Sequence, residues 1–449
     1  MNEGNTKCPG EPFVLPFLDP TVILPHSCLP YLKNLPDDDM TTNGNMRKRF
    51  AIRWTGSGWV GPELHESVKV DLSGEVNKLV PIIQDEISSA LLSELDNLKD
   101  WTTLDIQSKL IITVALVVGR TLLGLPLGRD PRWVQASLEH AMSCVMFSGK
   151  LRTFHPLLRP VVARFLPEMT EVKRTKAVVA SLLEPVIKSK IELLKAQEKG
   201  KHLSPDIPAE DARMMKWLIE KYHRNANGTI DPSLLIRDHL TLCFAAIHIT
   251  TIVATHIVFD LAAHTQYAEP LRAEISRELQ ASPDGTLTAK GVANLTLLDS
   301  FCKESSRINP AGMVAFLRMT HRAVTLPTNH VIPANTLIAV CHPRFNHNLS
   351  DFPEADKFDG YRFSKLRTQG ADEARLQLAG MSMDSLTFGY GVHGCPGRLF
   401  ASVVVKLIVA HLLMHFDVRL EGDSAVRPEN IFHDFMIMPP KAGIQIKRR

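Results

Sequence analysis

The sequence lacks the short motifs of several common enzyme classes. It contains no Gly-x-x-x-x-Gly-Lys-Ser/Thr loop, no His-Glu-x-x-His and no Gly-x-Ser-x-Gly, which mark phosphate-binding loops, zinc proteases and serine hydrolases. Its seven cysteines are scattered without a Cys-x-x-Cys pair, which argues against a disulfide framework or a zinc site and indicates a reducing compartment. The formal net charge is only +3 over 449 residues, so nothing suggests a nucleic-acid partner.

Long hydrophobic runs are also few, and each is interrupted. The apolar run Leu110–Val118 is too short to span a bilayer and predicts a buried helix. The run Leu240–Ala263 is long enough, but two histidines and an aspartate within it speak against lipid on all sides. We therefore expect no transmembrane segment. A hydrophobic content of 45% with 22% charged residues instead predicts a soluble enzyme with a large core.

The most informative stretch is a glycine-rich loop, Phe-Gly-Tyr-Gly-Val-His-Gly-Cys-Pro-Gly-Arg, which covers residues 388–398 and leads into the apolar run Ser402–Phe416. Its glycines let the backbone approach a flat ligand closely. Pro396 suits the first turn of a helix, so Cys395 is expected at a helix N-terminus, where free N–H groups favour a thiolate. A thiolate held in this way is a good axial ligand for haem iron.

This loop resembles the haem-binding loop of cytochrome P450s, whose pattern is Phe-x-x-Gly-x-Arg/His-x-Cys-x-Gly. The matching residues are Phe388, Gly391, His393, Cys395 and Gly397. The resemblance implies one haem b with Cys395 as the axial ligand of its iron.

The resemblance covers nearly the whole chain. It implies a mainly α-helical P450 fold with a small β-rich lobe, formed by residues 11–449. Residues 1–10 are then a polar tail without signal peptide, from which the membrane anchor usual in eukaryotic members is absent.

A second resemblance lies in the long apolar run. P450s carry Ala/Gly-Gly-x-Asp/Glu-Thr-Thr/Ser where dioxygen binds, and this chain has Ala-Ala-Ile-His-Ile-Thr-Thr from position 245. The small pair Ala245 and Ala246 leaves room for dioxygen. Ile249 replaces the threonine that helps deliver protons, and it has none to donate; Thr250, an ordered water or a substrate hydroxyl would have to substitute. His248 replaces the acid, either as a proton relay or as a core histidine bonded to a nearby backbone carbonyl.

A third resemblance is an ion-pair motif. Glu304 and Arg307 lie three residues apart, so they share one face of a helix over Leu295–Arg307. In P450s an arginine from a later segment joins this pair in a buried network that supports the haem loop, and Arg362 occupies the matching place. We expect these three residues to act structurally.

Other site residues follow from the same resemblance. Cationic side chains at Lys69, Arg318 and His393 are expected to bind the two haem propionates through charge-assisted hydrogen bonds. The residues expected to line an apolar substrate pocket are Ile249, Ala311, Met313 and Val314.

Local patterns predict several further elements. They are extended segments over Thr21–Leu24 and Phe50–Trp54, helices over Ser67–Ile83 and Lys173–Lys201, strands over Val314–Met319 and Thr336–Val340, and a final hairpin over Met436–Ile446.

The function implied is monooxygenation of a hydrophobic, terpenoid-derived secondary metabolite, because several segments are similar to ascomycete P450s of secondary metabolism. Electrons would come from NADPH through a separate reductase, since no flavin or nicotinamide domain is fused here. The expected location is the cytoplasm or the cytosolic face of the endoplasmic reticulum, with peripheral membrane contact allowed.

Two alternatives stay open. One is a haem-thiolate isomerase or dehydratase that does not activate dioxygen, which Ile249 supports. The other is a non-catalytic haem-binding member of the family, which the altered oxygen motif and the missing anchor permit.

Overall fold

A computed structural model describes residues 2–16, 18–198, 213–225, 230–343, 352, 354–422 and 426–449. Helices make up 60% of these residues and strands 12%, which confirms the predicted mainly α fold with small sheets. The chain divides into two compact units. The first contains residues 1–45, 91–110 and 249–449, and the second contains residues 46–90 and 111–248.

The helices of the described residues are short near the N-terminus and long in the middle of the chain. In chain order they are α1 (Asn2–Lys7), α2 (Leu29–Leu32), α3 (Thr42–Arg49), α4 (Ile52–Thr55), α5 (Pro62–Glu66), α6 (Ser73–Leu95), α7 (Ile106–Leu123), α8 (Pro131–Arg152), α9 (Arg159–Val162), α10 (Pro167–Glu198), α11 (Arg213–Asn225), α12 (Pro232–Ala263), α13 (Ala268–Gln280), α14 (Ala289–Asn294), α15 (Thr296–Ile308), α16 (Arg362–Thr368), α17 (Glu373–Leu376) and α18 (Arg398–His415).

The strands lie mainly in the first unit's N-terminal and C-terminal parts. They are β1 (Phe13–Leu15), β2 (Thr21–Leu24), β3 (Met40–Thr41), β4 (Thr102–Leu104), β5 (Val314–Thr320), β6 (Val324–Thr325), β7 (Val331–Ile332), β8 (Leu337–Cys341), β9 (Phe416–Leu420), β10 (Ile431–His433), β11 (Met436–Met438) and β12 (Ile444–Arg448).

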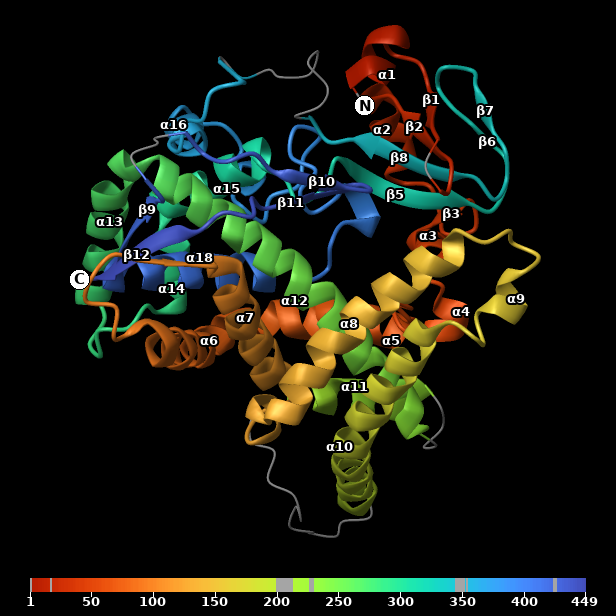
Figure 1. The fold of residues 1–449 in the computed structure, drawn as a ribbon, viewed down its shortest axis with the longest axis horizontal. Coiled ribbons are helices and arrows are strands. Elements are labelled where there is room, and N and C mark those ends of the chain that lie inside the picture. The colour runs from red at the N-terminus through yellow and green to blue at the C-terminus, as the bar shows by residue number, and fades with distance from the viewer. Residues whose placement is uncertain are drawn as a thin grey trace. The chain divides into compact units, whose positions relative to one another are not determined.

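The largest sheet of the first unit has the strand order β1-β2-β8-β5-β3, with β2 parallel to β8 and the other neighbours antiparallel. Figure 1 shows it beside α1 and α2, near the N-terminus. Successive side chains of a strand point to opposite faces. Ile338 and Val340 accordingly join one apolar cluster with Leu24, whereas Ala339 joins another with Ile23. The sheet is therefore buried on both faces.

Strand β5 contains an irregularity that its sequence does not predict. The register with β8 shifts between Ala315 and Arg318, and Phe316 has a positive φ of 54°. Val314 and Phe316 consequently enter different clusters on opposite faces, although they are two residues apart. A bulge of this kind turns the following side chains, here including Arg318.

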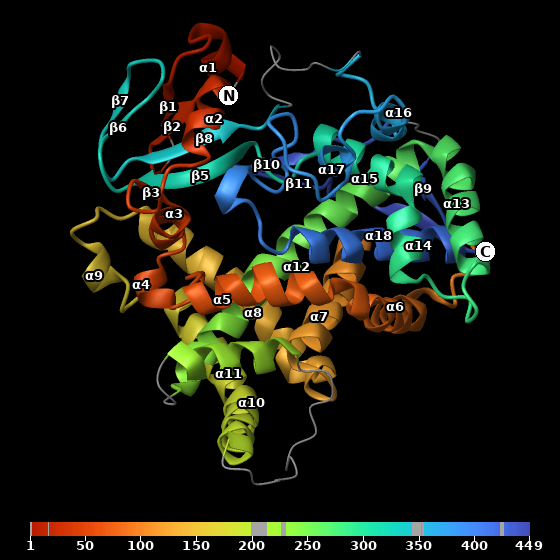
Figure 2. The same cartoon turned by 180° about the vertical axis from the view of Figure 1, so that it is seen from behind.

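The end of the chain corrects one prediction. We expected Met436–Ile446 to form a closing hairpin, but β11 pairs with the preceding strand β10, and β12 pairs with β9 and β4. The hairpin is therefore β10–β11. Helix α18 packs against α13 and α14 in this unit, close to the C-terminus (Figure 2).

The core of the second unit is the pairing of α8 with α10. Phe147 and Leu151 of α8 pack with Met169 and Val172 of α10 in one buried cluster. Within the same unit His140 accepts or donates hydrogen bonds at both ring nitrogens, to Ser57 Oγ at 2.7 Å and Thr175 Oγ1 at 2.9 Å. This histidine is thereby satisfied inside the core.

Three local predictions in the second unit change. Phe50–Trp54, expected as extended, instead overlaps the single helical turn of α4, with left-handed conformations at Ala51 (φ 48°) and Gly56 (φ 71°) on either side of that turn. The helix expected over Ser67–Ile83 begins as a π-helix over Ser67–Leu72 and continues as α6 to Leu95. Helix α10 starts at Pro167, six residues before the predicted Lys173.

Three helices among the described residues are long and apolar enough to cross a membrane by length and composition, namely α7, α12 and α18. In each, 56–61% of the most apolar window is buried inside the protein. Helix α7 continues through Arg120 to Leu123, beyond the short run predicted. The expectation that no segment spans a membrane stays a prediction.

Candidate functional site

The cysteine loop is held by its own backbone. The Cys395 N–H donates to the carbonyl oxygen of Phe388 at 2.7 Å, and α18 follows with Gly397 as its N-cap. Gly391 has a φ of 76°, and a Cβ there would lie 2.5 Å from the Cβ of Lys33. Only glycine satisfies both conditions. The loop therefore presents Cys395 just before the N-terminus of an apolar helix.

The surroundings of Cys395 shift the pKa of its thiol in opposite directions. Burial raises the pKa of the thiol, while a hydrogen bond from the N–H of Gly397 and the charge of Arg398 act in the opposite direction. These two groups alone leave the pKa above its ordinary value. A thiolate at this position needs a further positive partner, as a bound metal ion supplies.

Arg318 is a buried cation beside this loop. Its side chain donates from Nη2 to the carbonyl oxygen of His393 at 3.2 Å and from Nη1 to that of Leu317 at 2.8 Å, and the residue is 4% exposed. Burial lowers the pKa of Arg318 to about 10, and Asp37 acts against this. Among the residues that the structure describes, no carboxylate forms an ion pair with Arg318, and its Nε has no hydrogen-bond partner.

His393 lies beside Arg318, which donates to its carbonyl oxygen. Its Nε2 is 3.6 Å from Asp37 Oδ1. The structure thus brings together two of the three residues predicted to bind propionates. Lys69, the third, lies in the π-helix before α6 and is exposed.

The three ion-pair residues meet in one buried cluster. Glu304 is 0% exposed. Its carboxylate accepts hydrogen bonds from Nε and Nη2 of Arg307 at 2.7 and 2.8 Å, and from Nε of Arg362 at 3.1 and 3.2 Å. The Asp359 N–H adds a hydrogen bond at 3.0 Å, and Arg362 Nη2 also donates to the Lys357 carbonyl at 3.0 Å. The carboxylate and both guanidiniums are therefore compensated by charge and by hydrogen bonds.

The middle of α12 exposes one apolar face. Ala245 and Ile249 are four residues apart, so they share a face of the helix, and both are exposed, Ile249 by 42%. Thr250 is buried, at 9% exposure. Ala246 is half-buried, next to Ala245. Ile249 therefore lies on the exposed face of the helix, whereas Thr250, the candidate to replace the missing hydroxyl, does not.

His248 makes a contact that bears on its two interpretations. Its ring bonds to the backbone carbonyl of Leu138 in α8, and burial nevertheless lowers its pKa. The contact favours the interpretation as a core histidine over that as a proton relay.

The segment predicted to line the substrate pocket is tied to the β10–β11 hairpin. Met313 N donates to the Phe435 carbonyl at 2.8 Å, and Ile437 N donates to the Ala311 carbonyl at 3.0 Å. Val314 is buried in a cluster with Phe435. The hairpin was missed by sequence reasoning; the two short apolar runs on either side of Asp434 were its available signal.

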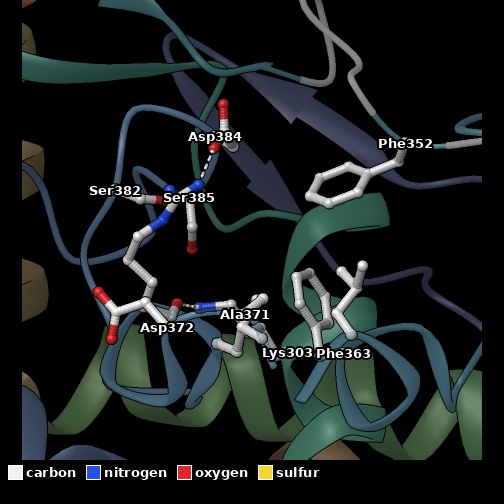
Figure 3. A pocket seen from close by; sticks show the side chains of 11 residues that line it. Lys303, Phe352, Phe363, Ala371, Asp372, Ser382, Asp384 and Ser385 are labelled. Atoms are coloured by element: carbon white, nitrogen blue, oxygen red, sulfur yellow. Dashed lines mark hydrogen bonds and ion pairs between the residues drawn. The ribbon is translucent and has the colours of Figure 1, made fainter. Parts of the chain in front are cut away.

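A surface cavity lies elsewhere in the first unit. Phe352 and Phe363 face Ser382, Asp384 and Ser385 across it in Figure 3. None of the predicted substrate residues lines it. Its buried amine, Lys303, donates to the carbonyls of Arg375 at 3.0 Å and Gln377 at 2.7 Å and is thereby satisfied.

Comparison with known proteins identifies the family. The sequence model "Cytochrome P450" matches residues 64–447. The chain is 31% identical to cytochrome P450 monooxygenase ascG of Acremonium egyptiacum and 32% identical to cytochrome P450 monooxygenase BOA4 of Botryotinia fuckeliana, in both cases over 99% of this chain and 88% of the relative. The chain belongs to the cytochrome P450 family, and it is a cytochrome P450 monooxygenase.

Membership of the family implies a haem-thiolate cofactor, and the observed residues fit one. A haem-thiolate cofactor would need a cysteine for its iron, a cation for its two carboxylates and an apolar face. The described residues include a group of each kind. They are Cys395 before α18, the buried Arg318, with which no described carboxylate forms an ion pair, and the exposed face of Ala245 and Ile249.

Proposed function

We propose that this protein is a haem b monooxygenase that oxidises a hydrophobic secondary metabolite. When bound, the haem supplies the activation of dioxygen for insertion of one oxygen atom into substrate. The observation that carries the proposal is Cys395, a half-buried thiol presented before a helix N-terminus, with too little positive charge around it to offset the rise of its pKa on burial. A carbon monoxide difference spectrum of the reduced protein tests it, because thiolate ligation gives a strongly red-shifted Soret band.

Each group of residues has a part in this proposal. Cys395 binds the iron, and Arg318 with His393 neutralises the ring's carboxylates. Ala245 and Ala246 keep the helix backbone close to the oxygen site. Phe388 holds the cysteine loop through its carbonyl oxygen. Glu304 and its two arginines fix the segment around Asp359, which supports this part of the unit.

For the substrate, we propose a polycyclic terpenoid or a molecule of similar shape and polarity. The proposed wall of Ile249, Ala311, Met313 and Val314 offers methyl and thioether groups but no charge. Screening terpenoids against aromatic polyketides for a low-to-high spin shift tests this class; a response confined to polyketides contradicts it.

We further propose that NADPH–cytochrome P450 reductase supplies the electrons and that the protein works at the cytosolic face of the endoplasmic reticulum. Turnover that depends strictly on NADPH and reductase, with one atom of labelled dioxygen in the product, supports monooxygenation. Product formation without either would favour a haem-thiolate isomerase or dehydratase, for which the exposed Ile249 is the supporting observation.

Replacing Arg318 with leucine is expected to weaken haem retention. A charge-assisted hydrogen bond contributes about 1.5–3 kcal/mol, so haem loss should be ~10–100-fold faster. The measurement is the rate of haem transfer to an excess of apomyoglobin. Arg322→Leu, an arginine with an exposed side chain in the same unit, is the control. An unchanged rate in Arg318→Leu would contradict the propionate role.

Replacing Ile249 with threonine is expected to improve the coupling of electron use to product. A hydroxyl on this exposed face can donate one hydrogen bond of about 1 kcal/mol, which corresponds to ~5-fold less peroxide per NADPH. Ile249→Val is the matched control, because valine has the shape of threonine without the hydroxyl. Equal peroxide release from the two variants would show that Ile249 does not limit proton delivery.

A further inference from the structure

A buried polar cluster joins three segments of the first unit. Asp260, in the second half of α12, is 1% exposed. Its carboxylate accepts hydrogen bonds from Ser305 Oγ at 2.5 Å and from Asn309 Nδ2 at 2.9 and 3.0 Å, both at the end of α15. Arg427 Nε lies 2.7 Å from its Oδ1. Helix α12, the end of α15 and the chain before β10 are thus joined at one carboxylate.

Arg427 extends this cluster to the β10–β11 hairpin. Its Nη1 donates to Asn430 Oδ1 at 2.7 Å, and its Nη2 donates to His256 Nδ1 at 2.9 Å. Because Nδ1 of His256 accepts, the ring proton lies on Nε2, which donates to the Ile437 carbonyl at 3.1 Å. Burial lowers the pKa of His256 to about 3, so the ring stays neutral in this tautomer.

The hairpin is therefore held by two sets of hydrogen bonds. In the first it bonds through its backbone to Ala311 and Met313, as described above. In the second, the carbonyl oxygen of Ile437 accepts from His256, and Asn430 Nδ2, next to β10, donates to Asn309 Oδ1 at 2.9 Å. A shift of the strand by one residue would break these bonds and turn every side chain to the opposite face.

We propose that Arg427 is a positioning residue that fixes the β10–β11 hairpin against Ala311–Met313 and so sets the shape of the substrate pocket. The inference rests on the proposed function for the pocket role of Ala311 and Met313. A buried ion pair holds one geometry because each charge is costly without its partner. The cluster therefore restricts the hairpin to one register, and with it the size of ligand that the pocket accepts.

The test uses variants that do not leave a charge buried alone. Arg427→Gln combined with Asp260→Asn removes both charges, and Arg427→Lys keeps the charge beside Asp260. His256→Leu removes the link to Ile437 together with the ring nitrogen that accepts from Arg427 Nη2. Arg322→Gln is the control, since Arg322 has an exposed side chain in the same unit.

The first measurement is amide hydrogen exchange of the protein as purified. We expect exchange at Met313 and Ile437 to become ~10-fold faster or more in the double variant, with little change elsewhere. His256→Leu should reproduce the effect, which keeps the test open if the double variant does not fold. Arg427→Lys should recover most of the protection. Unchanged exchange in the double variant or in His256→Leu would overturn the positioning role.

The second measurement compares two haem ligands of different size, imidazole and 4-phenylimidazole, by their nitrogen-ligand spectra. In the double variant and in His256→Leu we expect imidazole affinity within about twofold of wild type and 4-phenylimidazole affinity changed about fivefold or more. Equal changes for both ligands, or none, would overturn the role in pocket shape. If the wild-type protein gives neither spectrum, the proposed function fails, whereas the exchange result still decides whether Arg427 positions the hairpin.

Discussion

Cys395→Ala is expected to lose the thiolate-type carbon monoxide spectrum completely and with it all monooxygenase activity. The physical reason is that the axial bond to iron requires a thiolate, and the described part of the loop contains no second sulfur. Residual haem would be held by the carboxylate contacts alone, so its reduced carbon monoxide complex should have an unshifted Soret band. Absorption spectra of the reduced protein with and without carbon monoxide measure this.

The matched control is Cys8→Ala. Cys8 is the other cysteine that the described residues leave incompletely buried, so its removal creates no large core cavity. Its spectrum should be that of wild type. A normal red-shifted band in Cys395→Ala would refute the assignment of Cys395 as the iron ligand. It would also refute the interpretation of residues 388–398 as the haem-binding loop.

The cysteine loop could be predicted from sequence because its information is local. Four glycines, one proline and one cysteine within ten residues restrict the backbone strongly, and the loop that forms keeps the predicted order of loop, cysteine and helix. Apolar runs also predicted most of α12 and part of α7, whereas α8 was not predicted. The first residues of the helices were harder to predict. Helix α10 begins at Pro167, where a proline in the first turn, and not a change in hydrophobicity, sets the boundary.

Strand partners could not be predicted in the same way. Met436–Met438 and Ile444–Arg448 flank the turn residues Pro439–Gly443, and their closeness in sequence suggested one hairpin. They belong to different sheets, because β12 finds partners at β9 and at the distant β4. Strand pairing depends on contacts between residues that are far apart in the sequence, and a local sequence pattern does not show which strands will pair. The same holds for the bulge at Phe316, an aromatic residue in a left-handed conformation.

The oxygen motif shows a further limit. Its residue types could be aligned with the family, but which side chain faces outward depends on how α12 packs. The structure exposes Ile249 and buries Thr250, and it turns His248 to the carbonyl of Leu138. Sequence alone left these three positions open. Their roles in proton delivery remain predictions that the Ile249 variants test.

Arg362→Leu is expected to cost about 3–5 kcal/mol of unfolding free energy, because it leaves the buried Glu304 with one guanidinium partner instead of two. Arg362→Lys should recover little, since an ammonium cannot reach the carboxylate and the Lys357 carbonyl together. Urea unfolding followed by circular dichroism measures the loss. Haem content should fall in parallel if the cluster supports the cysteine loop.

The double variant Glu304→Gln with Arg362→Leu separates the cost of an uncompensated charge from the loss of support. Removing the carboxylate charge as well should return part of the unfolding free energy, since a neutral amide is less costly to bury than an unpaired carboxylate. Haem content should stay low, because the link between α15 and the segment around Asp359 is still broken. Arg322→Leu, with its exposed side chain, should change neither quantity. Full recovery of both stability and haem content would mean that the cluster balances charge without holding the site.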